Sequence, residues 1–321
     1  MKTEKLLSRR AALTRTGLIV GATLATKYGQ ATPASATSAA SSNPPFLFCL
    51  NTATIRGQKL GLIKEIEVAA QAGYQGIEPW ISTIEEYTKA GGSLKDAKKR
   101  LHDLGMTVES AIGFPEWLVD DDAKRAKGLE RAKYELDLVA QLGGKRLAAP
   151  PAGATNTPGL DLLKAAERYR ALLELGDQAG VVPQLELWGF SKNFYRLGQC
   201  ACAAIETGHP KACVLADIFH LYKGGSDFHG LKLLSENSVQ VLHVNDYPAD
   251  PPREKINDSF RVYPGDGSAP VVEILRLFHE TGGQKVLSLE VFNKKYWEQD
   301  AAEVARTGLE KMKITAAKAM A

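Results

Sequence analysis

The sequence predicts an α/β protein with a single (β/α)8 barrel, the TIM-barrel architecture, from two observations. First, eight short apolar runs of strand length recur within residues 46–321. Second, the segments between them show the apolar spacing of helices, and several end in a glycine where a left-handed cap is expected. Eight strand-and-helix units in a chain of this length match a barrel, which typically takes about 250 residues.

Each run is short and largely apolar, as expected of a strand in a barrel. In chain order the runs are residues 46–52, 75–80, 106–112, 145–150, 182–188, 213–219, 239–245 and 285–292. The glycines expected to end helices are Gly73, Gly105, Gly143, Gly180, Gly208 and Gly282. A doubly wound open sheet is the alternative, but it gives no reason for eight units, and no Gly-x-Gly-x-x-Gly follows the first run.

The N-terminal stretch has a different character and is predicted to be an export signal. Ser8-Arg9-Arg10 precedes a weakly apolar, uncharged run over residues 16–26, which is too short to span a bilayer, and Ala34-Ser35-Ala36 offers a small-residue cleavage site. The pattern resembles a twin-arginine signal, with an ordinary secretory signal or a basic tail as alternatives. We therefore expect a signal over 1–36, a flexible leader over 37–45 and a barrel domain over 46–321.

The charge and the cysteines exclude two classes of protein. Removing residues 1–36 takes away six of 40 basic and one of 37 acidic residues, so 34 basic and 36 acidic residues remain and the net charge is −2. A nucleic-acid partner is therefore not expected. The cysteines do not form a disulfide framework in a chain this long and are read as buried small residues: Cys49, Cys200, Cys202 and Cys213.

Polar residues interrupt the last four apolar runs, where a buried parallel strand should be almost wholly apolar. Each is flanked by apolar neighbours and lies near the C-terminal end of its run, the end at which barrel enzymes build their sites. Alternation along a strand aims all of them at the barrel axis. These residues are Glu186, Asp217, His243 and Glu290.

Three carboxylates in one small volume repel one another unless a cation neutralises them. Three oxygen ligands and one imidazole suit Mn²⁺, with Mg²⁺ or Co²⁺ as alternatives, and leave room for substrate or water. Taken singly, each residue has a structural explanation, as a cap, an ion-pair member or a core histidine. Their occurrence on four successive strands favours one shared divalent-metal site.

These residues resemble the xylose isomerase-like barrels, the sugar phosphate isomerase/epimerase family. The resemblance covers residues 46 to about 315 and extends beyond the four ligand candidates to Asp217-x-x-His220, Gly76-Ile77-Glu78, and Arg261 followed by PGDG at 264–267. It implies a metal held by the four candidates, with His220 and Arg261 contacting substrate oxygens. In the epimerases of this family the two glutamates, here Glu186 and Glu290, also serve as acid and base.

Further residues are expected near the mouth of the barrel. Glu78 is a candidate substrate contact, and Trp188 is one of several aromatic residues that could pack against the C–H face of a sugar. The long segment 247–267 carries Arg261 and is a candidate lid, with Arg253 as the rival arginine. Asp246 is either a partner of the site or a turn residue.

The expected function is a divalent-metal-dependent isomerase or epimerase that acts on a keto-sugar or polyol ketone. Proton abstraction and re-protonation would proceed through a metal-stabilised enediolate. A dehydratase on the same site is the alternative; a DNA-repair endonuclease and a non-catalytic sugar binder are further ones. The expected partners are a small sugar and the twin-arginine export machinery of a bacterium, with a periplasmic mature chain that is not inserted in the membrane. A homo-oligomer is possible, but nothing in the sequence marks an interface between copies of the chain.

Overall fold

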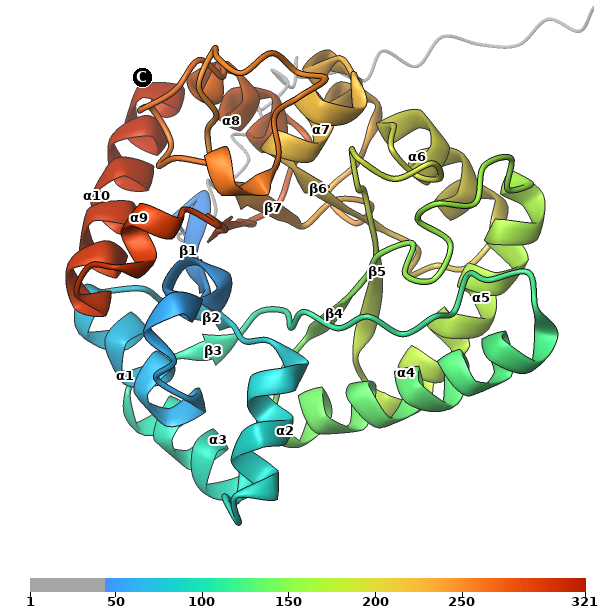
Figure 1. The fold of residues 1–321 in the computed structure, drawn as a ribbon, viewed down its shortest axis with the longest axis horizontal. Helices are drawn as coiled ribbons and strands as arrows, with labels where there is room; N and C mark the ends of the chain where they lie inside the picture. Colours follow the sequence, from blue (N-terminus) through green and yellow to red (C-terminus); the bar gives the residue numbers. More distant parts are fainter. Residues whose placement is uncertain (1–43) are drawn as a thin grey trace, which may run out of the picture. The chain divides into compact units, whose positions relative to one another are not determined.

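The computed structural model describes residues 44–321. Eight parallel strands lie at the centre with the helices outside them (Figure 1), which confirms the predicted (β/α)8 barrel. The strands are β1 (Phe46–Asn51), β2 (Gly76–Glu78), β3 (Thr107–Val108), β4 (Arg146–Ala149), β5 (Val182–Glu186), β6 (Val214–Asp217), β7 (Val241–Val244) and β8 (Lys285–Leu289). Each lies within one of the eight apolar runs.

The helices alternate with the strands along the chain. They are α1 (Leu62–Ala72), α2 (Ile81–Lys89), α3 (Leu94–Asp103), α4 (Asp122–Leu142), α5 (Leu162–Ala179), α6 (Leu197–Glu206), α7 (Ile218–Gly224), α8 (Val271–Glu280), α9 (Lys294–Trp297) and α10 (Ala301–Met320), with 3₁₀ turns η1 (Thr52–Gln58), η2 (Phe228–Leu233) and η3 (Asp258–Phe260). All six glycines expected to end helices have positive φ. No helix within residues 44–321 combines the length and the apolar character that crossing a membrane requires.

The strands are hydrogen-bonded in the order β3-β2-β1-β8-β7-β6-β5-β4. Backbone hydrogen bonds between the two end strands close the ring: Lys145 donates to Val108 (3.2 Å), Ala111 donates to Arg146 (3.0 Å) and Ala148 donates to Ala111 (2.9 Å). β3 is shorter than its apolar run. Its ladder with β2 breaks beside Pro79, which has no N–H to donate, and resumes only as a bridge between Trp80 and Ile112.

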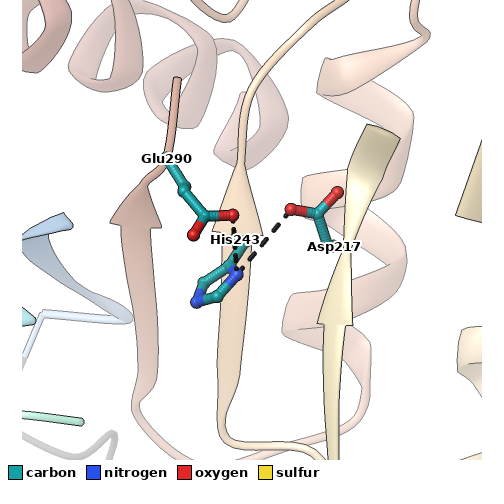
Figure 2. A group of neighbouring side chains, drawn as sticks. All are labelled: Asp217, His243 and Glu290. Carbon is teal, nitrogen blue, oxygen red and sulfur yellow. Dashed lines mark ion pairs between the residues drawn. The ribbon is translucent and has the colours of Figure 1, made fainter. Parts of the chain in front are cut away.

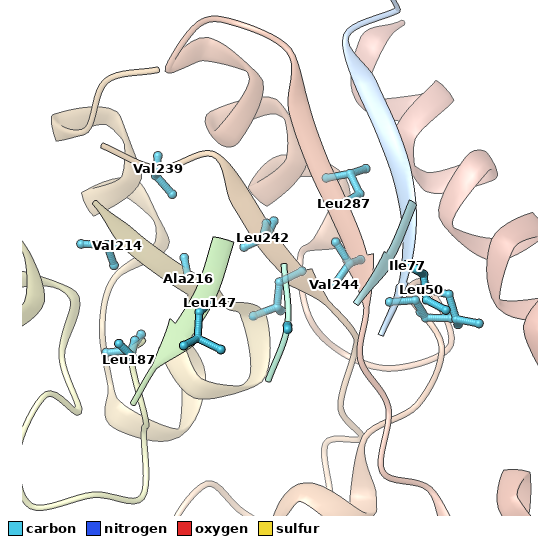
Figure 3. Packing of buried hydrophobic residues seen from close by; sticks show 14 of the residues in the cluster. Leu50, Ile77, Leu147, Leu187, Val214, Ala216, Val239, Leu242, Val244 and Leu287 are labelled. Atoms are coloured by element: carbon cyan, nitrogen blue, oxygen red, sulfur yellow. The ribbon is translucent and has the colours of Figure 1, made fainter. Parts of the chain in front are cut away.

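Side chains alternate along each strand between the barrel interior and the surrounding helices. Leu50, Leu242 and Leu287 are among the outward residues that pack in the layer between strands and helices (Figure 3). The interior holds a separate small apolar cluster that includes Val241 and Val286. Two residues further along the same strands, the alternation brings His243 and Ser288 into the interior, so a polar layer lies above an apolar one.

The cysteines and the N-terminal prediction have different outcomes. All four thiols are free, and those of Cys49, Cys200 and Cys213 are buried, as expected of small core residues.

The predicted export signal and nearly all of the leader lie outside the described residues. Both therefore stay predictions.

Glu65 is a buried carboxyl outside the polar layer, and it predicts a pH-dependent stability. Burial raises its pKa from 4.5 to about 7, and a hydrogen bond with the hydroxyl of Thr52 offsets this only in part. Between these two pH values the folded state holds a proton that the unfolded state has lost, so stability falls as pH rises through this window. The difference corresponds to about 3 kcal/mol.

Glu65→Gln is therefore expected to raise the free energy of unfolding at pH 8 by up to about 3 kcal/mol and to leave it nearly unchanged below pH 4.5. Urea denaturation at several pH values measures this. The exposed Glu130 provides the control, because Glu130→Gln should follow the wild-type pH profile. Parallel profiles for wild type and Glu65→Gln would contradict the prediction.

Candidate metal and substrate site

The four predicted ligand residues lie in the barrel interior at the C-terminal ends of successive strands. Glu186 and Asp217 end β5 and β6, His243 lies in β7, and Glu290 directly follows β8. All are buried, with at most 4% of any of them exposed. β6 and β7 are in register at Asp217 and His243, which brings these two side chains to the same depth.

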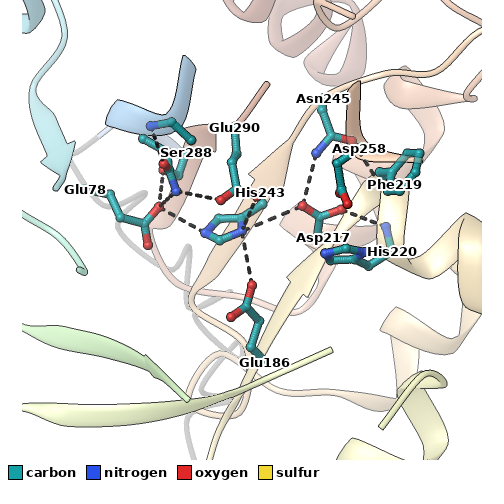
Figure 4. A network of polar contacts seen from close by, with 12 residues as sticks. Glu78, Glu186, Asp217, Phe219, His220, His243, Asn245, Asp258, Ser288 and Glu290 are labelled. Carbon is teal, nitrogen blue, oxygen red and sulfur yellow. Dashed lines mark hydrogen bonds and ion pairs between the residues drawn. The ribbon is translucent and has the colours of Figure 1, made fainter. Parts of the chain in front are cut away.

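The Nδ1 atom of His243 faces the three carboxylates. It is 3.1 Å from Glu290 Oε2, 3.7 Å from Asp217 Oδ2 and 4.0 Å from Glu186 Oε1 (Figures 2 and 4). Among residues 44–321, Asp217, His243 and Glu290 offer ligand atoms that all lie within 4.8 Å of one another. Glu186 lies at the margin of this group, so the structure brings three of the four together tightly and the fourth within reach.

The atoms in this cluster fit a divalent cation. His243 Nδ1 and Glu186 Oε2 are buried and have no hydrogen-bond partner in the described part of the chain. Burial of unpaired polar atoms is costly, and a cation that accepts their lone pairs removes the cost. Oxygen donors with a single imidazole are the donor set of Mn²⁺, Mg²⁺ and similar ions. Asp217, His243 and Glu290 would hold the ion, with Glu186 completing the set.

The electrostatics of the cluster also favour a cation. Burial raises the pKa of Glu186 to about 8, and the neighbouring carboxylates of Glu290 and Asp217 add to this against the opposing effect of His243. Burial alone would lower the pKa of His243, but Glu290 and Glu78 raise it well above its ordinary value. The raised pKa of Glu186 and the raised pKa of His243 both reflect an excess of negative charge around His243.

Glu78 lies on the other side of His243, not among the residues that line the cavity. Its Oε2 is 3.0 Å from His243 Nε2 and accepts hydrogen bonds from Asn51 Nδ2 (2.9 Å) and Ser288 Oγ (2.7 Å) (Figure 4). Burial on its own would raise the pKa of Glu78, but the interaction with His243 lowers it below the ordinary value. An ionised Glu78 holds the proton of His243 on Nε2 and leaves the Nδ1 lone pair for a cation. The geometry thus places Glu78 behind His243, where it supports the histidine. The sequence had led us to expect that Glu78 contacts the substrate.

Glu78→Gln is expected to weaken divalent-metal affinity by about 10- to 100-fold, the usual effect of losing a carboxylate behind a metal-binding histidine. Isothermal titration of chelator-treated protein with Mn²⁺ measures it directly. Glu65→Gln makes the same chemical change at another buried glutamate and should leave the affinity unchanged. Equal Mn²⁺ affinities for wild type and Glu78→Gln would show that Glu78 does not support metal binding.

Asp217 explains the Asp-x-x-His motif. Its Oδ1 accepts the backbone N–H of His220 (2.8 Å) and so caps α7, while Oδ2 accepts from Asn245 (3.1 Å) and faces His243. The same carboxylate therefore starts a helix and points into the cluster. The cap places the His220 ring beside the cavity.

Arg261, not the exposed Arg253, points into the site. Its Nη1 donates to Asp217 Oδ2 (2.7 Å) and Glu290 Oε2 (3.0 Å), and its Nη2 donates to Asp258 Oδ1 (2.6 Å). The guanidinium also lies between the rings of Phe219 (4.7 Å) and Phe292 (5.2 Å). A buried arginine is thus placed beside the ligand candidates.

His220 offers one free polar atom to the cavity region. Its Nε2 is 3.1 Å from Arg261 Nη2, a group that only donates, so Nε2 accepts and the proton lies on Nδ1. Nδ1 has no partner in the described residues, and burial lowers the pKa of the ring, which keeps it neutral. His220 therefore lines the cavity as a neutral imidazole whose Nδ1–H has no partner among the described residues.

Asp246 is a turn residue. It accepts the backbone N–H groups of Gly265, Gly267 and Ala269 at 2.8–3.0 Å, which organises the PGDG segment and anchors the loop 247–267. Both oxygens of its carboxylate accept these backbone hydrogen bonds. Of the two expected roles, partner of the site and turn residue, the structure therefore supports the second. The same loop carries Asp258 into the site.

Above the cluster lies a cavity of about 140 Å³. Its lining joins five polar residues to six apolar ones: Glu186, His220, Asp258, Arg261 and Glu290 with Trp80, Ile112, Phe114, Trp188, Phe190 and Phe292. Trp188 therefore lies where a substrate would be. Sequence reasoning missed Asn245, Asp258 and Ser288; of these, Asn245 could have been found, because it follows His243 at the two-residue period of the strand.

The fold and this cluster define a TIM barrel with a carboxylate and histidine centre at the C-terminal end of its strands. The chain belongs to the xylose isomerase-like TIM barrel family, whose model matches residues 66–315. It is 25% identical to an inosose isomerase of Bacillus velezensis over 268 residues, 82% of this chain and 94% of that protein. It is 24% identical to a 3-dehydroshikimate dehydratase of Pseudomonas putida over 254 residues, 77% of this chain and 39% of that protein.

Solved structures share the fold. The crystal structure of IolI with a bound zinc atom superposes with a TM-score of 0.78 at 21% identity, covering 85% of this chain and 98% of that one. L-ribulose 3-epimerase superposes with a TM-score of 0.68 at 18% identity, covering 85% and 95%. Relatives of this chain thus include isomerases and dehydratases, and an epimerase shares its fold.

Proposed function

We propose that this protein is a divalent-metal-dependent isomerase or epimerase that acts on a keto-sugar or a related polyol ketone. The observation that carries the proposal is the buried, unpartnered His243 Nδ1, which faces carboxylate oxygens of Asp217, Glu290 and Glu186 within 4.0 Å. Glu186 and Glu290 of this cluster also line the cavity. Family membership supports the reaction class, and Mn²⁺ is the ion we propose, on the chemistry of the donor set.

Two carboxylates reach the cavity from separate strands. Glu186 ends β5 and Glu290 follows β8, with β6 and β7 between them. They can therefore address different faces of a substrate carbon, one removing a proton and the other returning it. A bound cation would stabilise the negative charge that proton removal leaves on the substrate oxygens. His220 Nδ1–H donates to a substrate oxygen, and Arg261 holds Glu290 and Asp217 in place.

Proton NMR of the product formed in D₂O tests this function. Chelator-treated protein is supplied with Mn²⁺ and incubated with a panel of free ketoses and inososes. Isomerisation or epimerisation is expected to return an isomer that carries deuterium at one carbon. No exchange into any ketone, with or without Mn²⁺, Mg²⁺ or Co²⁺, would reject the proposal.

A dehydratase that uses the same site is the second candidate, because the identity to 3-dehydroshikimate dehydratases is close to the identity to inosose isomerases. Both reactions begin by removing a proton next to a carbonyl. The same NMR experiment separates them, since elimination gives an unsaturated or deoxy ketone and no isomer.

Export remains a separate proposal. It rests on Arg9-Arg10 and the weakly apolar run after them, in residues that the structure does not describe. Fractionation of bacterial cells that express the full chain, with Arg9→Lys/Arg10→Lys as the comparison, tests it. A periplasmic location that does not depend on this pair would reject the twin-arginine route.

A further inference from the structure

Five aromatic side chains form a continuous collar at the cavity above the cluster. Consecutive ring centroids are 6.1 Å apart from Phe292 to Trp80, 5.3 Å from Trp80 to Phe114, 5.9 Å from Phe114 to Trp188 and 5.2 Å from Trp188 to Phe190. All five rings line the cavity. They follow β2, β3, β5 and β8, so the collar is built from several sides of the barrel.

The cavity lining changes from apolar at its outer end to polar at its floor. At its floor, Glu186, His220, Arg261 and Glu290 are each at most 4% exposed. In the collar, Phe114 and Phe190 are 41% and 43% exposed, and the other three rings are partly exposed. A substrate in this cavity therefore meets charged and polar groups at its inner end and aromatic rings at its outer end.

The collar has little hydrogen-bonding capacity to offer. The indole N–H of Trp80 is already donated to Asn51 Oδ1 at 3.3 Å, the indole N–H of Trp188 is directed to the carboxylate of Glu186, and phenylalanine rings have no polar atom. Asp258, the most exposed charged residue of the lining, is engaged with Arg261. One ring can pack on the C–H face of a sugar, but a collar on several sides would desolvate outward hydroxyls without replacing their hydrogen bonds.

The lining also disfavours an anionic substituent. Arg261 is the one cationic side chain among the lining residues, and it is already paired with Asp217, Glu290 and Asp258. A phosphate at the outer end would lie beside aromatic faces, whose quadrupole repels anions. The exposed Arg56 is stacked on the Trp80 ring, 4.1 Å from its centroid, and is not one of the lining residues.

We infer that the substrate is a keto-sugar that carries an apolar ring substituent, such as an aryl group, with its sugar oxygens at the floor and its ring inside the aromatic collar. This inference rests on the proposed function and narrows its substrate class. Rings in contact at these separations gain stability beyond simple burial, because edge and face orientations complement one another. In this arrangement the aromatic collar binds the apolar substituent, and the polar residues at the floor carry out the reaction on the sugar.

Isothermal titration of the Mn²⁺-loaded protein with phenyl and methyl β-D-glucopyranoside tests the inference. Both compounds lack a ketone and do not react. The phenyl compound is expected to bind about tenfold more tightly. Phe114→Ala and Phe190→Ala should each reduce this preference. Tyr134→Ala removes an equally exposed aromatic residue of α4 that does not line the cavity and should leave the preference unchanged.

Equal or undetectable binding of the two glycosides would overturn the inference, as would a preference that survives Phe114→Ala and Phe190→Ala together. Deuterium exchange into free ketoses reports separately on the proposed function. Deuterium exchange into ketoses without preferential binding of the phenyl glycoside would reject the apolar ring substituent and leave the proposed function standing. A phenyl preference that depends on Phe114 and Phe190 supports the collar even where exchange fails and the reaction class has to be revised.

Discussion

Glu290→Gln is expected to lower the rate of deuterium incorporation into a ketose substrate by about 10²- to 10⁴-fold, the usual contribution of a positioned acid or base. The carboxamide keeps the shape of the side chain but cannot take up the substrate proton. Glu290 Oε1 accepts from Asn51 (3.0 Å), and Oε2 faces His243 (3.1 Å) and Arg261 (3.0 Å), so the side chain is held in one orientation. Initial rates by proton NMR in D₂O with saturating Mn²⁺ measure the effect.

Glu65→Gln is the matched control for this experiment. It exchanges another buried glutamate for glutamine outside the cavity and should keep the wild-type exchange rate. Circular dichroism establishes that Glu290→Gln is folded. A folded, metal-loaded Glu290→Gln that exchanges protons at the wild-type rate would show that Glu290 is not an acid or base of the reaction.

Adding Mn²⁺ to chelator-treated protein is expected to raise Tm by about 5–10 °C at a concentration one hundred times Kd. The stabilisation expected from binding at that concentration is about 2.7 kcal/mol, and each kcal/mol corresponds to about 2–4 °C for a domain of this size. The physical reason is the crowding of Asp217 and Glu290 around His243 Nδ1, which a cation relieves. Differential scanning fluorimetry across a metal series measures the shift.

Asp217→Asn should abolish most of this shift, because it removes one charged ligand. Asp217 also caps α7, so the variant is compared with Asp161→Asn, which changes the N-cap of α5, belongs neither to the cluster nor to the cavity lining, and preserves a good capping residue. Asp161→Asn is expected to keep the full metal-dependent shift. A wild-type protein whose Tm does not respond to Mn²⁺, Mg²⁺ or Co²⁺ would contradict a divalent-metal site.

Much of this site could be predicted because strand alternation is a local property. Asp217, His243 and Glu290 each have apolar neighbours on both sides along the chain, and the two-residue period aims them at the interior whatever the neighbouring strands are. The capping of α7 by Asp217 is also local, since it joins residues three apart. For the same reason the (β/α)8 barrel could be inferred from repeated short-range patterns alone.

Contacts between distant segments could not be predicted in this way. Glu78 and His243 are 165 positions apart, and their pairing depends on β1 and β8 joining β2 to β7 in the closed sheet. Asp258 reaches Arg261 only through the path of a loop that Asp246 anchors. The aromatic collar likewise needs several strand ends to converge.

The amino-acid sequence by itself determined which residues point inward, at which end of the barrel they lie, and the ligand class to which they belong. The tertiary structure decided that Glu78 lies behind His243, that Arg261 faces the cavity in place of Arg253, and that the aromatic rings of Trp80, Phe114 and Trp188 meet around one opening. The physical reason is that alternation is set by neighbouring residues along the chain, whereas partners across the barrel are set by strand order, closure and loop path.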